Sequence, residues 1–251
     1  MLKFTKYNHS PYPDALLKEA EGLEYLRKLA ADNPYIKTPH IYQVDENQLE
    51  ITHIRTQPAS QQQMANLGKG LAFIHHQKQS SYGFKHGNYI GLNPQPNILS
   101  SDWGQFFVEY RLGFQISLIK NNQVKEHFAQ ILSEYQQSLI HFLNGSTAYA
   151  SLIHGDLWAG NVLFDAQDIW LIDPAAYFGD READIAMTEM FGGFSEDFYR
   201  AYNQNLPLSP QYPQKKMIYN LYHYLNHYNL FGSSYLSACQ QGFSFLQSLS
   251  T

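Results

Sequence analysis

The 251-residue sequence predicts an α+β protein of two lobes, in which a small lobe is built on a β-sheet and a large lobe is mainly helical. Three observations predict this arrangement. Strand, helix, strand and strand patterns follow one another in residues 1–56. Helical periodicity of apolar residues dominates residues 57–251. Within that stretch, a short apolar strand, a polar loop and a β-hairpin occupy residues 151–173. We therefore expect the domains to be residues 1–56 and residues 57–251.

The small lobe is expected to contain three strands and one helix. The strands are predicted at residues 2–7, 41–44 and 49–54, where apolar residues alternate around turn-forming residues. Asp14 is a candidate N-cap for the helix, and Pro34 ends it.

The large lobe is predicted to begin near Ala59 and to consist mostly of amphipathic helices. Residues 83–97 are rich in Gly, Asn and Pro and predict a long ordered loop. Asp102 and Gln105 resemble a capping box at the start of an aromatic helix. Stripes of aromatic and Met residues at helical spacing are typical of a core, so we assign no function to them.

Composition excludes several classes of protein. The net charge of −5 gives no general attraction for nucleic acid. Cys239 is the only cysteine, which excludes an internal disulfide and argues against a cysteine metal site. The sequence contains no long apolar run and no apolar segment typical of a signal peptide at its start. We expect a cytoplasmic monomer or weak homodimer with no nucleic-acid or membrane partner.

One motif indicates phosphoryl transfer from ATP. His154 and Asp156 are followed by Asn161 in the spacing His-x-Asp-x₄-Asn, and Asp173 comes after the predicted hairpin. Kinases use this spacing to supply a base and two Mg²⁺ ligands. Each residue alone is typical of a turn or a cap, but the joint pattern favours a kinase site. We predict that Asp156 is the base, and that Asn161 and Asp173 bind Mg²⁺.

A cation for the phosphates is also expected. Lys6 lies on the first predicted strand and Glu19 on the helix after it, which is the kinase order of a phosphate-binding Lys and its orienting Glu. The alternative is that both side chains are solvated. His75 and His76 have no third ligand at a suitable spacing, so we interpret them as ordinary polar residues.

With these motifs, the sequence resembles the fructosamine kinase (ketosamine-3-kinase) family. That family is protein-kinase-like and related to the aminoglycoside phosphotransferases and choline kinases. The resemblance extends over about residues 4–235. It is carried by residues 88–91, 94–97, 102–107, 154–161, 172–184, 191–194 and 225–232. It implies a two-lobed protein-kinase-like fold and ATP-dependent phosphorylation of the sugar 3-hydroxyl of ketoamines, on glycated small amines or proteins. The product then decomposes and frees the amine.

The resemblance also implies roles for individual residues. It makes Lys6 and Glu19 the ion pair of the small lobe. Backbone groups of Thr52, His53 and Ile54 would meet the adenine at the hinge.

On the acceptor side, the resemblance implies that Trp158 stacks on the sugar or its amine, close to the base. It also implies that His154 contacts the substrate. For Arg181, Glu182 and Asp184 it leaves two roles open, support of the loop or contact with the substrate.

One departure from the family pattern affects the small lobe. The family has two strands and a Gly-rich turn before the lysine strand, which would occupy about 25–35 residues. Here five residues precede Lys6. Either the small lobe is truncated, or the true start of the protein lies upstream. A truncated sheet would leave Lys6 on an edge strand, without a lid over the phosphates.

Three alternatives to an active ketoamine kinase follow from the residues. The first is a truncated, weakly active or inactive kinase-like binding protein. The second is a kinase of another small hydroxylated amine, similar to an aminoglycoside or choline. The third is a metal hydrolase with His154 and Asp156 as ligands.

Overall fold

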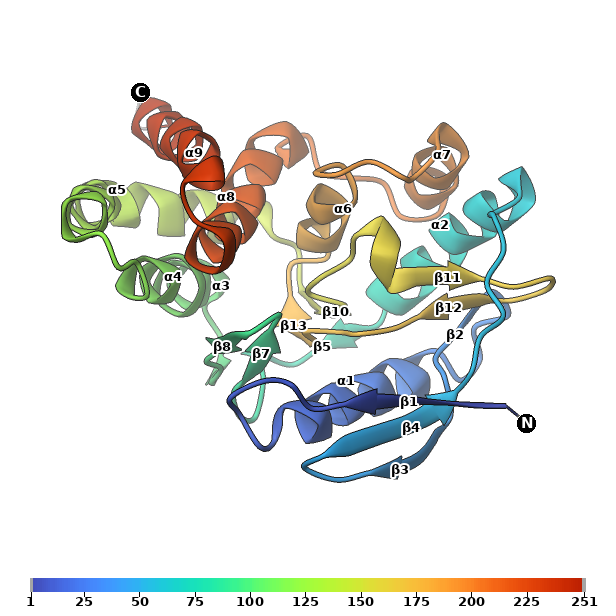
Figure 1. The fold of residues 1–251 in the computed structure, drawn as a ribbon. Coiled ribbons are helices and arrows are strands. Elements are labelled where there is room, and N and C mark those ends of the chain that lie inside the picture. The colour runs from blue at the N-terminus through green and yellow to red at the C-terminus, as the bar shows by residue number, and fades with distance from the viewer. Residues whose placement is uncertain (1, 250–251) are drawn as a thin grey trace.

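The structure is a computed structural model that describes residues 2–249. A small antiparallel sheet with one helix lies on one side of the molecule, and the helices of the large lobe lie on the other (Figure 1). The strands of this sheet and its helix are β1 (Lys3–Tyr7), β4 (Gln48–Thr52), β3 (Ile41–Val44) and α1 (Ala15–Leu29). The sheet order is β1-β4-β3, and within the described residues β1 pairs with β4 alone.

The small sheet is held against α1 by a compact apolar cluster. Leu16 and Ala20 of α1 pack on Leu49 and Ile51 of β4, and all four are buried. The predicted strands and helix are confirmed, although the last strand ends at Thr52, two residues earlier than expected. Asp14 precedes α1 but does not cap it through its side chain.

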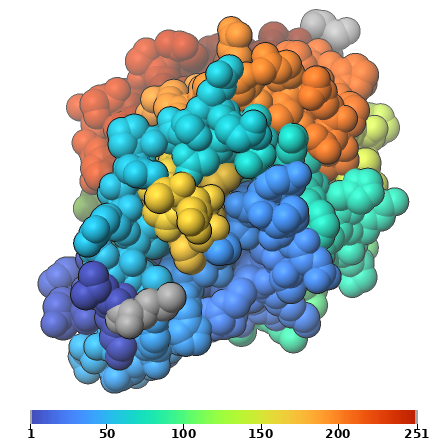
Figure 2. All heavy atoms as spheres, turned by 90° about the vertical axis from the view of Figure 1, so that its right-hand side faces the viewer, coloured from blue at the N-terminus to red at the C-terminus, as the bar shows by residue number. Residues whose placement is uncertain are grey.

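A short strand that the sequence did not reveal joins the small lobe to the hairpin of the large lobe. β2 (Ile36–Lys37) runs parallel to β12 (Ile169–Leu171), which pairs with β11 (Val162–Phe164). On the other side of the hairpin, the backbone nitrogen of Gln57 donates to the carbonyl oxygen of Phe164 at 2.9 Å. In Figure 2 the yellow hairpin is enclosed between blue and cyan segments. The hairpin is therefore held by residues from both lobes.

The large lobe is built from the expected amphipathic helices. Ser60 forms a full capping box with Gln63 at the start of α2. The Asp102 carboxylate accepts from the backbone nitrogen of Gln105, but the Gln105 side chain donates to Glu109, so this box is only half formed. The helices are α2 (Gln61–His75), α3 (Trp103–Phe107), α4 (Phe114–Ser117), α5 (Asn122–Ser146), α6 (Glu182–Thr188), α7 (Glu196–Asn205), α8 (Tyr212–Phe231) and α9 (Leu236–Ser248). A π-helical segment (Val108–Gly113) joins α3 to α4.

Two apolar cores fill the large lobe. The larger core lies between α3, α5, α8 and α9, where Phe128 stacks on Phe243 with ring centroids 4.2 Å apart. The smaller core lies between α2, α7 and the hairpin. The expected assignment of the aromatic stripes to the core is confirmed for most of their residues. Each fully buried Phe contributes about 1.5–3 kcal/mol to stability. Among the described residues, no helix combines the length and apolarity that crossing a bilayer requires.

The predicted loop at residues 83–97 is ordered by hydrogen bonds and by one buried cation. Arg111, on the π-helical segment, is fully buried with its guanidinium 3.8 Å from the Tyr177 ring centroid. It donates to the Asn97 side chain at 2.6 Å and to the carbonyl oxygen of Pro96 at 2.9 Å. The loop contains a small hairpin of β7 (Asn88–Ile90) and β8 (Asn93–Gln95). This packing places one edge of the loop beside the site described next.

A five-stranded sheet crosses the middle of the large lobe in the order β5-β10-β13-β6-β9. Its strands are β5 (Lys78–Gln79), β10 (Ala150–Ile153), β13 (Tyr177–Gly179), β6 (Tyr82–Gly83) and β9 (Leu99–Ser100). The strand β10 is buried along its whole length, and it leads directly into the polar loop at His154.

Candidate active site

The loop after β10 is fixed in place by one buried carboxylate. Asp184, on α6, accepts from the backbone nitrogens of His154 at 2.7 Å and Gly155 at 2.9 Å. It also contacts the His75 ring at 3.2 Å. Gly155 has a φ of +81°, and a Cβ there would lie 2.2 Å from the carbonyl oxygen of Ala175, so only glycine fits. These contacts fix the backbone of the loop immediately before Asp156.

Asp156 is held by the amide of Asn161. The Asn161 Nδ2 donates to the Asp156 carbonyl oxygen at 2.8 Å and to its Oδ2 at 3.2 Å. A 3₁₀ turn (Ala159–Asn161) brings the two residues together. Burial raises the pKa of Asp156 to about 7. A carboxyl group with this pKa can accept a proton at neutral pH.

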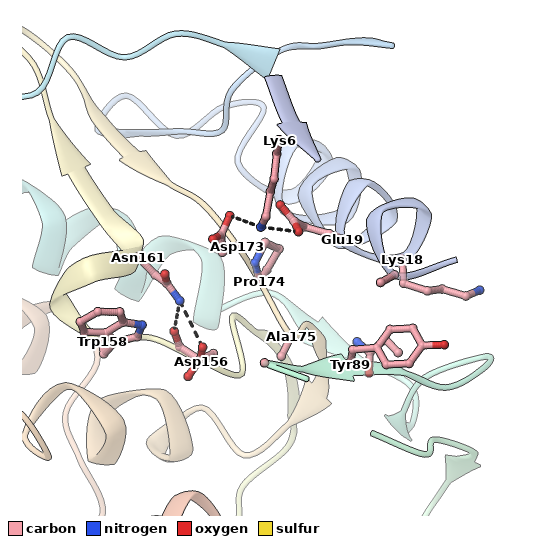
Figure 3. A pocket seen from close by; sticks show the side chains of 13 residues that line it. Lys6, Lys18, Glu19, Tyr89, Asp156, Trp158, Asn161, Asp173, Pro174 and Ala175 are labelled. Atoms are coloured by element: carbon pink, nitrogen blue, oxygen red, sulfur yellow. Dashed lines mark hydrogen bonds and ion pairs between the residues drawn. The ribbon is translucent and has the colours of Figure 1, made fainter. Parts of the chain in front are cut away.

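Asp173 follows β12 and lies beside the lysine of β1. Its φ of +51° makes it the only non-glycine residue with positive φ in the described chain. The Lys6 Nζ lies 3.1 Å from Asp173 Oδ1 and 2.7 Å from Glu19 Oε2 (Figure 3). Residues 6, 19 and 173, far apart in the sequence, therefore form one ionic group.

The charges of this group are set by burial and by each other. Burial alone would lower the pKa of Lys6, but the carboxylates of Glu19 and Asp173 outweigh it and raise that pKa. Burial raises the pKa of Glu19 to about 7. Lys6 consequently stays a cation and faces a cavity of about 290 Å³ that Glu19, Asp156, Asn161 and Asp173 also line.

Two further cavities adjoin this central one, on opposite sides. A slot of about 340 Å³ shares Lys6 and Asp173 with it. The slot is lined by Phe4, Ile51, Thr52, His53, Ile54, Leu163 and Ile172. Its mostly apolar walls suit a flat heterocyclic ring. The three predicted hinge residues are thus brought together with Lys6.

The other neighbouring cavity lies on the far side of Asp156. This basin of about 460 Å³ shares Asp156, Trp158 and Gly91 with the central cavity. The Trp158 ring lies over Gly160, where a Cβ would be 2.2 Å from its Cη2, and the side chain is 42% exposed. The expected place of Trp158 beside Asp156 is therefore found. Neighbouring cavities share lining residues, and we call the slot, the central cavity and the basin together the path.

His154 does not reach this path, which differs from the expected substrate contact. Its ring is buried, its Nε2 donates to the carbonyl oxygen of Ile172 at 2.9 Å, and its Nδ1 accepts from the backbone nitrogen of Asp156. Burial lowers the pKa of His154, so the ring is neutral. The ring links the loop at Asp156 to Ile172, next to Asp173, and we correct its role to positioning of the loop.

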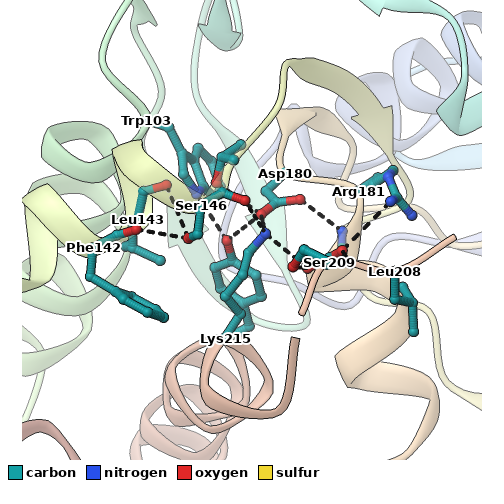
Figure 4. Close-up of polar contacts among 12 residues, drawn as sticks. Trp103, Phe142, Leu143, Ser146, Asp180, Arg181, Leu208, Ser209 and Lys215 are labelled. Atoms are coloured by element: carbon teal, nitrogen blue, oxygen red, sulfur yellow. Dashed lines mark hydrogen bonds and ion pairs between the residues drawn. The ribbon is translucent and has the colours of Figure 1, made fainter. Parts of the chain in front are cut away.

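Neither Arg181 nor Glu182 lines the cavities around Asp156. Glu182 is buried and Arg181 is half-buried, and Figure 4 shows Arg181 in the same region as Asp180, Ser209 and Lys215. Glu182 accepts from Lys215 Nζ at 2.8 Å and from Ser209 Oγ at 2.8 Å. Lys215 also pairs with Asp180 at 2.5 Å. Glu182 is buried and lines none of the three cavities, so of the two roles left open the structure favours support.

Arg181 makes contacts of the same supporting kind. Its guanidinium donates to the Tyr202 hydroxyl at 3.0 Å and to the carbonyl oxygens of Leu206 and Pro207. These bonds tie the start of α6 to the end of α7. Asp184, for which the same two roles were open, supports the loop through the bonds described above.

Sequence reasoning missed two sets of residues at the site. Tyr89 lines the central cavity, and its hydroxyl donates to Asp14 at 2.5 Å. The basin is lined by Phe191, His227, Phe231 and Tyr235. His227 and Phe231 lie on α8 at the spacing of a core stripe, whereas Phe191 follows α6 and Tyr235 follows α8. Residues 191–194 and 225–232 carry part of the family resemblance, but nothing in the sequence indicated that these side chains line a cavity.

Comparison with known proteins decides the family. The sequence model of the fructosamine kinase family matches residues 2–248. The chain belongs to the fructosamine kinase family. It is an ATP-dependent small-molecule kinase, as expected from the His-x-Asp-x₄-Asn motif.

Relatives and solved structures agree with this. The chain is 38% identical over 247 residues to a probable ketoamine kinase of Vibrio parahaemolyticus, covering 94% of this chain and 82% of that protein. It is 36% identical to a chloroplastic protein-ribulosamine 3-kinase of Arabidopsis thaliana, covering 94% of this chain and 73% of the relative. A crystal structure of a candidate fructosamine-3-kinase from Haemophilus somnus has a TM-score of 0.83 at 27% identity, covering 99% of this chain and 84% of that one.

More distant structures share the fold alone. The gentamicin complex of an aminoglycoside phosphotransferase has a TM-score of 0.58 at 14% identity. With these likenesses, the expected α+β, protein-kinase-like fold is confirmed.

Proposed function

We propose that the chain phosphorylates the sugar 3-hydroxyl of ketoamines of the fructosamine or ribulosamine type, using ATP and Mg²⁺. One observation carries the proposal. Asp156, whose pKa burial raises to about 7, lies where a cavity lined by Lys6, Asn161 and Asp173 meets a basin without other charged residues. A base at that boundary can serve a nucleotide on one side and a sugar on the other. The names of the relatives support ketoamines as the acceptors.

The two predicted domains would have different roles in catalysis. Residues 1–56 would supply Lys6 for the phosphates, with Glu19 orienting it at 2.7 Å. Backbone groups of Thr52, His53 and Ile54 would meet the adenine in the slot. Residues 57–251 would supply the loop and the hairpin. Action in the cytoplasm, on small or protein-bound ketoamines, remains our prediction from the sequence.

The donor set fits Mg²⁺. Asn161 uses its Nδ2 for Asp156, which leaves Oδ1 as the atom available to a metal ion. Asp173 contacts Lys6 through Oδ1, and its Oδ2 is the second carboxylate oxygen. Asn161 and Asp173 both line the central cavity. Oxygen donors of this kind are the ligands that Mg²⁺ prefers. The ion would neutralise phosphate charge, which is the chemistry that phosphoryl transfer needs.

Transfer then follows from the placement of Asp156. The acceptor hydroxyl donates its proton to the Asp156 carboxylate while its oxygen bonds to the γ-phosphorus. The bond from that phosphorus to the oxygen of the leaving ADP breaks, and Lys6 stays against the inner phosphates. Trp158 presents a ring face to the sugar on the basin side.

An assay of ATP consumption tests the proposal. The panel holds fructosyl-lysine, ribulosyl-lysine, choline and an aminoglycoside at equal concentration. We expect kcat/KM for at least one ketoamine to exceed that for choline and the aminoglycoside by ten-fold or more, with phosphate on the sugar in the product. Turnover of choline or the aminoglycoside without turnover of either ketoamine would reject it.

A second prediction concerns the metal. Asp173→Ala should abolish most of the gain in ATP affinity that Mg²⁺ gives, because it removes the charged oxygen offered to the ion. Titrating ATP with and without Mg²⁺ measures the gain. Asp168→Ala is the matched control, since Asp168 lies on the same hairpin and pairs with exposed Lys37. Equal Mg²⁺ dependence in the wild type and in Asp173→Ala would remove Asp173 from the site.

A further inference from the structure

The basin beside Asp156 has an unusual surface for a folded protein. Three of its aromatic side chains are widely exposed: Trp158 by 42%, Phe191 by 47% and Phe231 by 65%. They come from three separate segments of the chain, the catalytic loop, the turn after α6 and the end of α8. Exposed aromatic side chains gathered around one hollow are typical of a binding surface.

His227 holds the aromatic side chains of the basin together. Its ring centroid lies 5.3 Å from that of Phe191, 5.6 Å from that of Phe231 and 5.0 Å from that of Tyr235. Within the described residues its buried Nδ1 has no hydrogen-bond partner. Burial lowers the pKa of His227, so the ring is neutral and adds no charge to the basin.

Charge is scarce in the basin. Among the described residues that line it, Asp156 is the only carboxylate, and none is Lys or Arg. A polycationic acceptor would need several carboxylates to replace its hydration. An apolar or aromatic group, in contrast, gains contact with Phe191, Phe231, Leu230 and Met187.

We propose that this basin binds the group attached to the ketoamine nitrogen of the acceptor. It selects ketoamines in which that group is aromatic or bulky and apolar. The inference rests on the proposed function, because that function places the sugar hydroxyl at Asp156. The ketoamine nitrogen is three bonds from the 3-carbon of the sugar, so its substituent leaves the sugar close to Asp156. The central cavity is taken by the phosphates, and the basin is the adjoining space that shares Trp158.

The test uses three fructosyl ketoamines that differ only in the amine: phenylalanine, glycine and the triamine spermidine. Calorimetry gives Kd for each, and the kinase assay gives kcat/KM. We expect the phenylalanine ketoamine to bind ten-fold or more tightly than the other two. Phe231→Ala should reduce that preference at least three-fold. Phe73→Ala is the matched control, because Phe73 is also an exposed Phe, on α2, and lies away from the basin.

The outcomes separate this inference from the proposed function. Equal Kd values for the three ketoamines, no binding of any, or a preference unchanged in Phe231→Ala and in Tyr235→Leu would overturn the inference. If the ketoamines bind with the expected preference but none is phosphorylated, the inference stands and the proposed function fails. If all are phosphorylated with equal kcat/KM and equal Kd, the proposed function stands and the inference fails. Melting temperatures near that of the wild type show that the variants are folded.

Discussion

Asp156→Asn should lower kcat by about a hundredfold or more, which is the usual effect of removing a general base. The amide keeps the shape of the side chain and can still contact Asn161, but it cannot take the proton of the acceptor hydroxyl. ATP affinity should change less than twofold, because Asp156 lies on the acceptor side of the central cavity. Steady-state kinetics and calorimetry with ATP measure the two quantities.

Asp168→Asn serves as the control for Asp156→Asn. Asp168 is also an Asp of the large lobe, on the turn of the hairpin, but it lines none of the three cavities. Its kcat should equal that of the wild type. A rate near wild type for Asp156→Asn itself would show that another group takes the proton.

Asp184→Ala should cause the largest loss of stability among the site variants. Removal of the carboxylate leaves the buried backbone N–H groups of His154 and Gly155 without an acceptor. Each stranded donor costs about 1–3 kcal/mol in the free energy of unfolding. The loop would also lose the anchor that orients Asp156, so kcat should fall together with stability. Urea denaturation and the kinase assay measure the two effects.

The stability prediction has its own control. Asp168→Ala removes an exposed ion pair with Lys37, 2.7 Å long, and exposed pairs of this kind contribute about 0.2–1 kcal/mol. An unfolding midpoint of Asp184→Ala equal to that of Asp168→Ala would contradict the anchoring role.

The parts of the site whose residues lie close together in the sequence were predictable from it. Asp156 and Asn161 are five residues apart and meet through one 3₁₀ turn, so the motif fixes their contact. Lys6 and Glu19 come from consecutive elements, and their ion pair forms as expected. The position of Asp173 near Asn161 could be predicted because the antiparallel hairpin brings its end back beside its beginning.

Other parts could not be predicted because they depend on partners far away in the sequence. The strand β2 has two residues and exists only through its pairing with β12, more than a hundred residues later. Glu182 appeared available for substrate because nothing near it in the sequence reveals that Lys215 and Ser209 surround it. Phe231, at the end of α8, has the periodicity of a core stripe, but its side chain is 65% exposed.

The buried charge cluster of Asp180, Glu182 and Lys215 has a consequence for how this sequence can evolve. All three side chains are buried, and Lys215 is the cation that pairs with both carboxylates. Loss of Lys215 alone would remove the cation that pairs with Asp180 and would leave Glu182 with the longer Arg181 contact, at 3.6 Å. Loss of one carboxylate would weaken the compensation of a buried cation. The three positions therefore form an epistatic unit. A substitution at one of these positions should cost less stability when a partner is substituted as well, so we expect the three positions to change together during evolution.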